Sequence, residues 1–159
     1  MLKNKLLFSM LCVAALGLSG CASDPGTKGG DGDGPGATTG PGKMDAERMK
    51  QLLAKRTVYF EFDSVTLTGE NQEIVQAHGQ HLAASKTKLS LEGHADERGT
   101  REYNLALGER RAQSVERVMR ALGVGSDRVK LHSYGEEKPV AKGSDESAWR
   151  LNRRVEILY

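Results

Sequence analysis

Aromatic side chains are scarce in this sequence, where they account for only 5% of the 159 residues. This scarcity argues against a base-stacking surface for nucleic acid and against a large aromatic-lined ligand cavity. An excess of one charge sign is also missing, because 23 basic and 21 acidic residues leave a formal net charge of +2. Nucleic acid is therefore not an expected partner. The length allows one domain of ordinary size plus some unstructured sequence.

Cysteine is nearly absent, and its two copies, Cys12 and Cys21, both lie near the N-terminus. A disulfide between them would close only a small loop far from any core, so we expect no structural disulfide. Thiol chemistry is not expected either, because the globular part offers no cysteine to pair with them.

A long apolar run is missing as well. Residues 6–18 are apolar apart from Ser9 and Gly17, and they follow Lys3 and Lys5, which is typical of the start of a secretory signal. A membrane-spanning helix needs about 20 apolar residues, so a permanent transmembrane anchor is the weaker interpretation of this shorter run.

The segment Leu18–Cys21 reads LSGC and resembles the bacterial lipobox. The resemblance implies that residues 1–20 are a lipoprotein signal peptide and that Cys21 is acylated. One acyl chain anchors a protein only marginally, whereas the three chains of a mature bacterial lipoprotein give stable anchoring. Ala22 and Ser23 stand where an aspartate would mark retention in the inner membrane. The resemblance therefore implies an outer-membrane lipoprotein whose domain faces the periplasm.

A flexible tether is predicted over residues 21–43. Residues 22–43 contain eight glycines and three prolines and no large apolar residue, so they cannot build a core. A Gly-rich coil of this length has a root-mean-square span of about 25 Å, which suits a connection between a bilayer and the cell wall. A linker with no selected length is the alternative. The globular domain is predicted over residues 44–159.

Periodicity predicts the elements of this domain. Alternation with period two indicates strands over 57–62, 88–95, 128–134 and 153–158, and helical spacing indicates helices over 45–53, 69–85, 102–122 and 145–151. From the first strand onward the order is β-α-β-α-β-(α)-β, which predicts an α+β sandwich with a mixed sheet and helices packed on one face. In the first strand, Val58, Phe60 and Phe62 share one face that is predicted to point into the core, and Phe62 at the strand end could also contact a ligand.

The loop from Gly93 to Thr100 concentrates charge where a strand gives way to the longest helix. A helix start presents unpaired N–H groups and attracts carboxylates. Asn104 and Arg111 lie two helical turns apart on one face, and Gly108 between them is predicted to leave space for a shallow slot.

Asp96 is placed at the strand end, above this slot. A carboxylate facing a guanidinium across a gap suits a ligand that carries both an ammonium and a carboxylate on one carbon. The alternative interpretation is an ordinary ion pair between Asp96 and Arg111, worth about 0 to 1 kcal/mol at a surface.

Five motifs follow one another in a fixed order over residues 58–159. They are YFEFDS at 59–64, GHADERGT at 93–100, EYNLALGERRA at 102–112, SYGEEKP at 133–139 and NRRVEI at 152–157. Together they resemble the OmpA-like domain family and, more narrowly, its peptidoglycan-associated lipoproteins. The resemblance implies an OmpA-like sandwich that binds the meso-diaminopimelate of the peptidoglycan stem peptide, which bears an amine and a carboxylate on one carbon.

The resemblance also assigns ligand contacts. Asp96 is expected to take the ammonium and Arg111 the carboxylate, while Asn104 lines the slot. The remaining expected contacts are the neighbouring wall of Phe62, Asp63 and Ser64, the backbone of Ala95, and an arginine at the far side, Arg153 or Arg154. Alternation along the strand puts these two arginines on opposite faces, so only one is expected to touch ligand, and the choice stays open.

The implied function is non-covalent tethering of the outer membrane to peptidoglycan in the Tol–Pal system during envelope constriction and cell division. The implied partners are peptidoglycan, the propeller protein TolB and other Tol proteins, and neither a cofactor nor an enzymatic activity is expected. Two alternatives stay open: an OmpA-like wall-binding lipoprotein outside the Tol system, and a metal-dependent wall hydrolase. The latter would use His94 and Asp96 together with His78 and His81.

Overall fold

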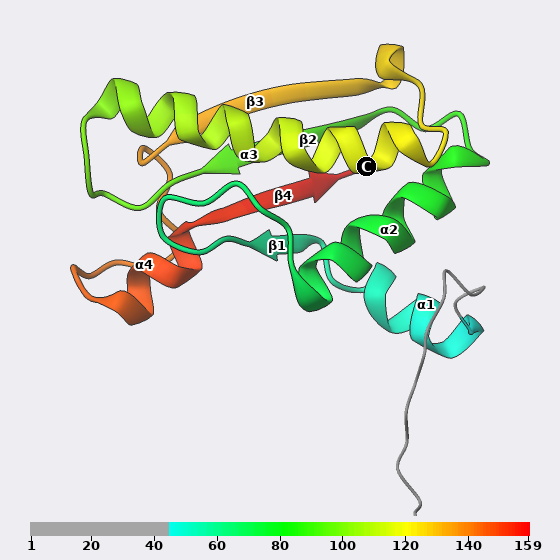
Figure 1. Cartoon of the computed structure of the whole chain (residues 1–159), viewed down its shortest axis with the longest axis horizontal. Helices are drawn as coiled ribbons and strands as arrows, with labels where there is room; N and C mark the ends of the chain where they lie inside the picture. Colours follow the sequence, from blue (N-terminus) through cyan, green and yellow to red (C-terminus); the bar gives the residue numbers. More distant parts are fainter. Residues whose placement is uncertain (1–44) are drawn as a thin grey trace, which may run out of the picture. The chain divides into compact units, whose positions relative to one another are not determined.

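A mixed four-stranded sheet organises the computed structural model of this chain, which describes residues 45–159 (Figure 1). The strand order is β1-β4-β2-β3, in which β2 and β3 are parallel and the other two pairs are antiparallel. The elements are α1 (Ala46–Leu53), β1 (Thr57–Tyr59), α2 (Gly69–Ala83), β2 (Leu89–His94), α3 (Arg101–Ala121), a 3-10 turn (Ser126–Arg128), β3 (Val129–Gly135), α4 (Glu146–Asn152) and β4 (Arg154–Leu158). This arrangement confirms the predicted α+β class.

The predicted signal peptide, the lipidation of Cys21 and the tether lie outside the described residues. Among residues 45–159, none of the helices combines the length and the apolar character that crossing a membrane requires.

Side-chain caps fix where three of the helices begin. The carboxylate of Asp45 accepts from the N–H of Arg48 at 2.7 Å, and that of Asp145 accepts from Ala148 at 3.0 Å. The hydroxyl of Thr100 accepts from Tyr103 at 3.2 Å. Each cap satisfies one of the N–H groups that a helix start leaves unpaired. At the other end of α3, Gly123 has a φ of 100°, the left-handed conformation in which many helices end.

The hydrophobic core lies between the sheet and helices α2 and α3. Alternate strand residues point into it, as the period-two patterns predicted. The buried set includes Val58, Leu89, Leu91, Val155 and Ile157 from the strands, and Ile74, Val75, Leu82, Ala112, Val115 and Met119 from the helices.

The first strand is shorter than predicted, and the prediction that Phe62 faces the core is wrong. Phe60 is buried and its N–H still donates to the carbonyl of Arg153 at 2.9 Å, but Phe62 is 57% exposed. The cause is a turn at Asp63, whose φ of 52° lies in the left-handed region. This turn directs the Phe62–Ser64 segment toward the end of β2.

Helix α3 approaches β2 so closely that the two backbones touch. A Cβ atom on Gly93 would lie 1.9 Å from the carbonyl oxygen of Gly108, and one on Gly108 would lie 2.4 Å from the hydroxyl oxygen of Ser133. The prediction that Gly108 leaves space for a ligand slot is therefore wrong, because the backbone of β2 fills that space.

Candidate functional site

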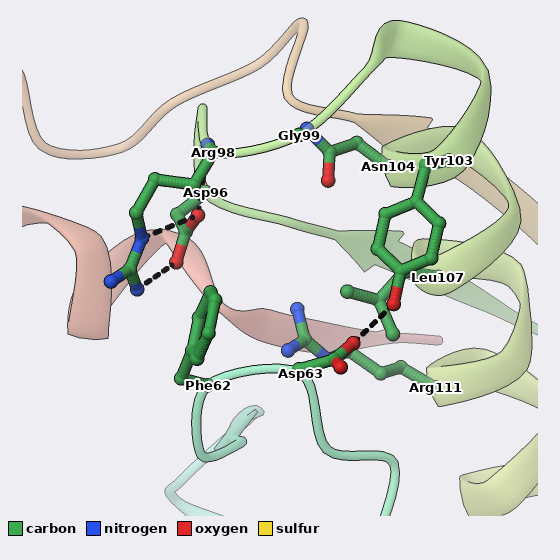
Figure 2. A pocket seen from close by; sticks show the side chains of 9 residues that line it. All are labelled: Phe62, Asp63, Asp96, Arg98, Gly99, Tyr103, Asn104, Leu107 and Arg111. Atoms are coloured by element: carbon green, nitrogen blue, oxygen red, sulfur yellow. Dashed lines mark hydrogen bonds and ion pairs between the residues drawn. The ribbon is translucent and has the colours of Figure 1, made fainter.

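A pocket of about 220 Å³ opens where the Phe62 segment, the loop after β2 and the first turns of α3 meet (Figure 2). One stripe of α3 supplies several of its walls, since residues 103, 104, 107 and 111 recur at helical spacing. The lining residues are Phe62, Asp63, Asp96, Arg98, Gly99, Tyr103, Asn104, Leu107 and Arg111. The predicted contacts Asp96, Asn104, Arg111, Phe62 and Asp63 thus line one pocket.

Arg111 is fully buried, and backbone carbonyls hold its guanidinium. Nε donates to the carbonyl of Ser64 at 2.9 Å, Nη1 to that of His94 at 2.8 Å, and Nη2 to that of Glu61 at 3.2 Å. Burial lowers the pKa of Arg111 to about 10, so the group stays cationic at neutral pH. Since a guanidinium has five N–H donors, one on Nη1 and one on Nη2 remain for an anion.

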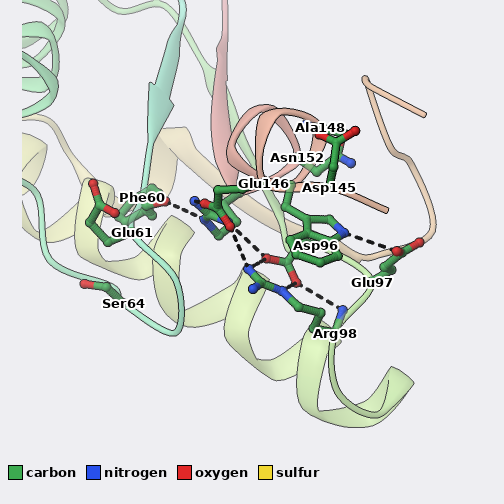
Figure 3. Close-up of polar contacts among 12 residues, drawn as sticks. Phe60, Glu61, Ser64, Asp96, Glu97, Arg98, Asp145, Glu146, Ala148 and Asn152 are labelled. Carbon is green, nitrogen blue, oxygen red and sulfur yellow. Dashed lines mark hydrogen bonds and ion pairs between the residues drawn. The ribbon is translucent and has the colours of Figure 1, made fainter. Parts of the chain in front are cut away.

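Asp96 is also buried, and it carries a negative charge. Its Oδ1 accepts from the backbone N–H of Arg98 at 3.0 Å and from Nε of Arg98 at 3.2 Å. Its Oδ2 accepts from Nη2 of Arg98 at 2.6 Å and from Nη1 of Arg153 at 3.3 Å (Figure 3). Burial raises the pKa of Asp96, but the hydrogen bonds from Arg98 and Arg153 outweigh it, and the net pKa is lowered.

The alternative of an ion pair between Asp96 and Arg111 is wrong. Within residues 45–159, none of the ion pairs involves Arg111. The pocket therefore presents a negative and a positive group separately, as the predicted recognition of an amino-acid head requires.

Asn104 adds an acceptor to this pocket. It is 1% exposed, its Nδ2 donates to the carboxylate of Glu136, and its Oδ1 has no hydrogen-bond partner among the described residues. Figure 2 shows this oxygen directed into the pocket. A buried acceptor without a partner is a position where a ligand N–H is favoured.

Tyr103 and Asp63 form the outer wall. The Tyr103 hydroxyl donates to the Asp63 carboxylate, and this hydrogen bond raises the pKa of Tyr103. Sequence reasoning did not single out Tyr103 or Leu107. Their spacing from Arg111 on the same helix was the available signal, because residues four apart share a face.

Ser64 and Ala95 do not line the pocket. Ser64 acts through its carbonyl, which holds Arg111. The N–H of Ala95 is already used, because it donates to the carbonyl of Gly135 at 2.8 Å. This N–H is therefore not free for a ligand, and a ligand contact through the backbone of Ala95 stays a prediction.

The two arginines before and in β4 have different neighbours. Arg153 is 1% exposed and donates to the carbonyl of Phe60 at 3.0 Å and to the carboxylate of Glu146 at 2.6 Å, in addition to Asp96. Arg154 donates to Glu156 at 2.8 Å. Arg153 is thus the one beside the pocket, and it supports Asp96 without lining the cavity.

Arg98 is another pocket residue that sequence reasoning missed. Its guanidinium lies over the rings of Phe62 and Trp149, at 4.0 and 4.1 Å from their centroids. The signal was local, since an aspartate that accepts from the N–H two residues later is a common turn motif.

Two of the histidines considered for a metal site, His78 and His81, lie beside the ring of Tyr159. His78 is buried and bonds the hydroxyl of Tyr159 at 2.9 Å and the carbonyl of Lys55 at 2.8 Å, whereas His81 is exposed. Within residues 45–159, His, Cys, Asp and Glu side chains form no group of three that could hold a metal ion.

Comparisons with known proteins identify the family. The model of the OmpA family matches residues 59–153. The peptidoglycan-associated lipoprotein of Pseudomonas putida is 44% identical, with 94% of each chain covered. That of Haemophilus influenzae is 39% identical, with 98% of this chain and 99% of that protein covered. This chain belongs to the peptidoglycan-associated lipoproteins of the OmpA family.

Solved structures agree with this membership. The crystal structure of the peptidoglycan-associated lipoprotein from Burkholderia pseudomallei is 47% identical, with a TM-score of 0.66 over 68% of this chain and 92% of that one. The C-terminal domain of Helicobacter pylori MotB is 21% identical, with a TM-score of 0.59 over 64% of this chain and 81% of that one, and it shares the OmpA-like fold.

Proposed function

We propose that this chain is a non-enzymatic outer-membrane lipoprotein that binds the diaminopimelate of peptidoglycan in the pocket beneath Phe62. The observation that carries the proposal is the separate presentation of a buried anion, Asp96, and a buried cation, Arg111, in one cavity. These are the charges that complement an ammonium and a carboxylate on the same carbon.

Each group of the ligand has a partner in this pocket. The two free N–H groups of Arg111 suit the ligand carboxylate, because a guanidinium binds carboxylates bidentately. Asp96 and the unpaired Oδ1 of Asn104 accept from the ammonium. Leu107 and Phe62 supply apolar surface for the methylene chain.

The rest of the chain extends this proposal to the envelope. Residues 1–20 serve as the signal peptide, Cys21 carries the acyl anchor, 22–43 act as the tether and 44–159 bind the wall. Family resemblance supports TolB as a protein partner that competes with the wall for the same surface. The chain then connects the outer membrane to peptidoglycan within the Tol system, which acts in envelope integrity and cell division.

The test compares two soluble stem peptides, one with meso-diaminopimelate and one with lysine at the same position. Lysine lacks the carboxylate that Arg111 would hold, so we expect isothermal titration calorimetry to show a loss of roughly 1.5 to 3 kcal/mol in binding free energy. Equal affinities for the two peptides would contradict the proposed pocket.

A pair of variants tests the proposed contact between Asp96 and the ligand ammonium. Asp96→Asn keeps the shape but removes the charge, and we expect diaminopimelate peptide to bind about tenfold more weakly or worse. Glu92→Gln removes a carboxylate from β2 that does not line the pocket and should bind like the unmodified chain. Equal losses in both variants would indicate a general charge effect in place of a specific contact.

A further inference from the structure

The acceptor positions of Asp96 are already full. A carboxylate offers about four lone-pair positions. In this chain two hydrogen bonds reach Oδ1 and two reach Oδ2, and Arg98 donates three of these four. An incoming ammonium has no free position on Asp96 unless Arg98 moves its guanidinium away.

Three neighbouring side chains hold Arg98 in place beside the pocket. Its guanidinium forms the ion pair with Asp96 at 2.6 Å while it contacts the rings of Phe62 and Trp149. A cation over an aromatic ring is stabilised by the ring's electrons, and most strongly over tryptophan. The ring of Trp149 is itself held in place, because its Nε1 donates to the carboxylate of Glu97 at 3.1 Å.

A second carboxylate, that of Glu146, lies close enough to accept the guanidinium of Arg98. The side chain of Arg98 is 30% exposed, unlike the buried Arg153, and Oε2 of Glu146 lies 3.7 Å from its Nη2. A small rotation would strengthen this second contact and leave Asp96 to Arg153 and the ligand. Figure 3 shows Glu146 and Asp96 on neighbouring sides of Arg98.

We propose that Arg98 is an internal competitor for the ammonium subsite, and that ligand binding transfers its guanidinium from Asp96 to Glu146. The proposal rests on the proposed function, because it concerns the same pocket. Arg98 would then select for cationic ligands. A ligand without a cationic group cannot replace the guanidinium that Asp96 loses when Arg98 moves away.

Calorimetry on the full chain in detergent tests the competition, with the meso-diaminopimelate stem peptide as the probe. We expect Arg98→Ala to bind about two- to fivefold more tightly, the size of one partly exposed ion pair. Arg101→Ala is the matched control, because Arg101 pairs with Glu137 and does not contact Asp96, and its affinity should not change. Unchanged or weaker binding by Arg98→Ala overturns the proposal.

The fluorescence of Trp149 gives a second readout that needs no variant, because it is the single tryptophan of the chain. Displacement of Arg98 from its ring should change the emission during a peptide titration, with the midpoint found by calorimetry. Binding heat without an emission change overturns the transfer of Arg98 but leaves the proposed function standing. Absence of binding heat in the unmodified chain contradicts the proposed function itself.

Discussion

His94 links the ligand pocket to the opposite face of the sheet. Its carbonyl holds Arg111, whereas its side chain is 2% exposed and lies 3.9 Å from the carboxylate of Glu156. Neither ring nitrogen has a hydrogen-bond partner among the described residues. Burial, and to a lesser extent the nearby charge of Arg154, lowers the pKa of His94 to about 4, although Glu156 acts in the opposite direction.

This lowered pKa predicts that the fold weakens in mild acid. The unfolded chain takes up the proton near pH 6.5, whereas the folded chain takes it up only near pH 4. The contribution of neutral His94 is therefore complete above pH 6.5 and is lost as the pH falls toward 4, by up to about 3 kcal/mol. Urea unfolding at several pH values measures this loss.

His94→Gln should flatten the dependence of unfolding free energy on pH between 4.5 and 6.5. Part of the slope should remain, because burial also lowers the pKa of His78 and acts with the same sign. An unchanged slope in His94→Gln would show that the burial of His94 has no such cost. His132→Gln, at an exposed position of the neighbouring strand, is the control.

At the scale of elements, α3 shows what the sequence could and could not predict. Helical periodicity placed Asn104 and Arg111 on one face, and the strand pattern placed Asp96 at the end of β2. Each of these two predictions needs only the pattern within a single helix or strand. Whether Gly108 faces a ligand or another element depends on the distance between α3 and β2, which periodicity within one element does not give. At this close contact β2 also has a glycine, Gly93.

The exposed position of Phe62 could not be predicted from the sequence pattern either. Alternation continues through residue 62 in the sequence, and no glycine or proline marks the turn that Asp63 makes. In the sequence, Arg98 is one of several charged residues of the same loop. Its role depends on Phe62 and Trp149, which come from segments far apart in the chain.

The close contact of α3 with β2 predicts an unusual response to alanine. In most helix interiors Gly→Ala is stabilising by about 0.5 to 1 kcal/mol. In Gly108→Ala the new Cβ meets the hydroxyl of Ser133 and the backbone of Gly93 at 2.4 and 2.9 Å. We therefore expect the free energy of unfolding to fall by about 1 to 3 kcal/mol, because backbone must shift.

Gly79→Ala is the matched control for this experiment. Gly79 also lies inside a helix, but its new Cβ would meet the end of the Leu122 side chain at 2.6 Å, which can rotate away. Chemical unfolding should therefore show a much smaller change for Gly79→Ala than for Gly108→Ala. Similar losses in the two variants would contradict a rigid contact between α3 and β2.

At the scale of the whole molecule, the sheet order brings distant segments together. Because β4 lies between β1 and β2, its end runs beside the segment that enters β1 (Figure 1). The N–H of Ile157 donates to the carbonyl of Arg56 at 2.8 Å, and the Arg56 guanidinium lies 4.1 Å from the Tyr159 ring centroid. His78 of α2 completes this junction through its bonds to Tyr159 and Lys55.

The junction predicts that one hydroxyl matters far from the ligand pocket. Tyr159→Phe leaves Nδ1 of the fully buried His78 without its partner, and an unsatisfied buried group costs about 1 to 3 kcal/mol. We expect the thermal midpoint to fall while the affinity for diaminopimelate peptide stays unchanged, because none of these residues lines the pocket. Tyr59→Phe, at a more exposed tyrosine, should leave the midpoint within a degree or so of the unmodified chain. A Tyr159→Phe variant that unfolds like Tyr59→Phe would mean that solvent replaces the hydroxyl, and that backbone pairing of β4 alone joins the two segments.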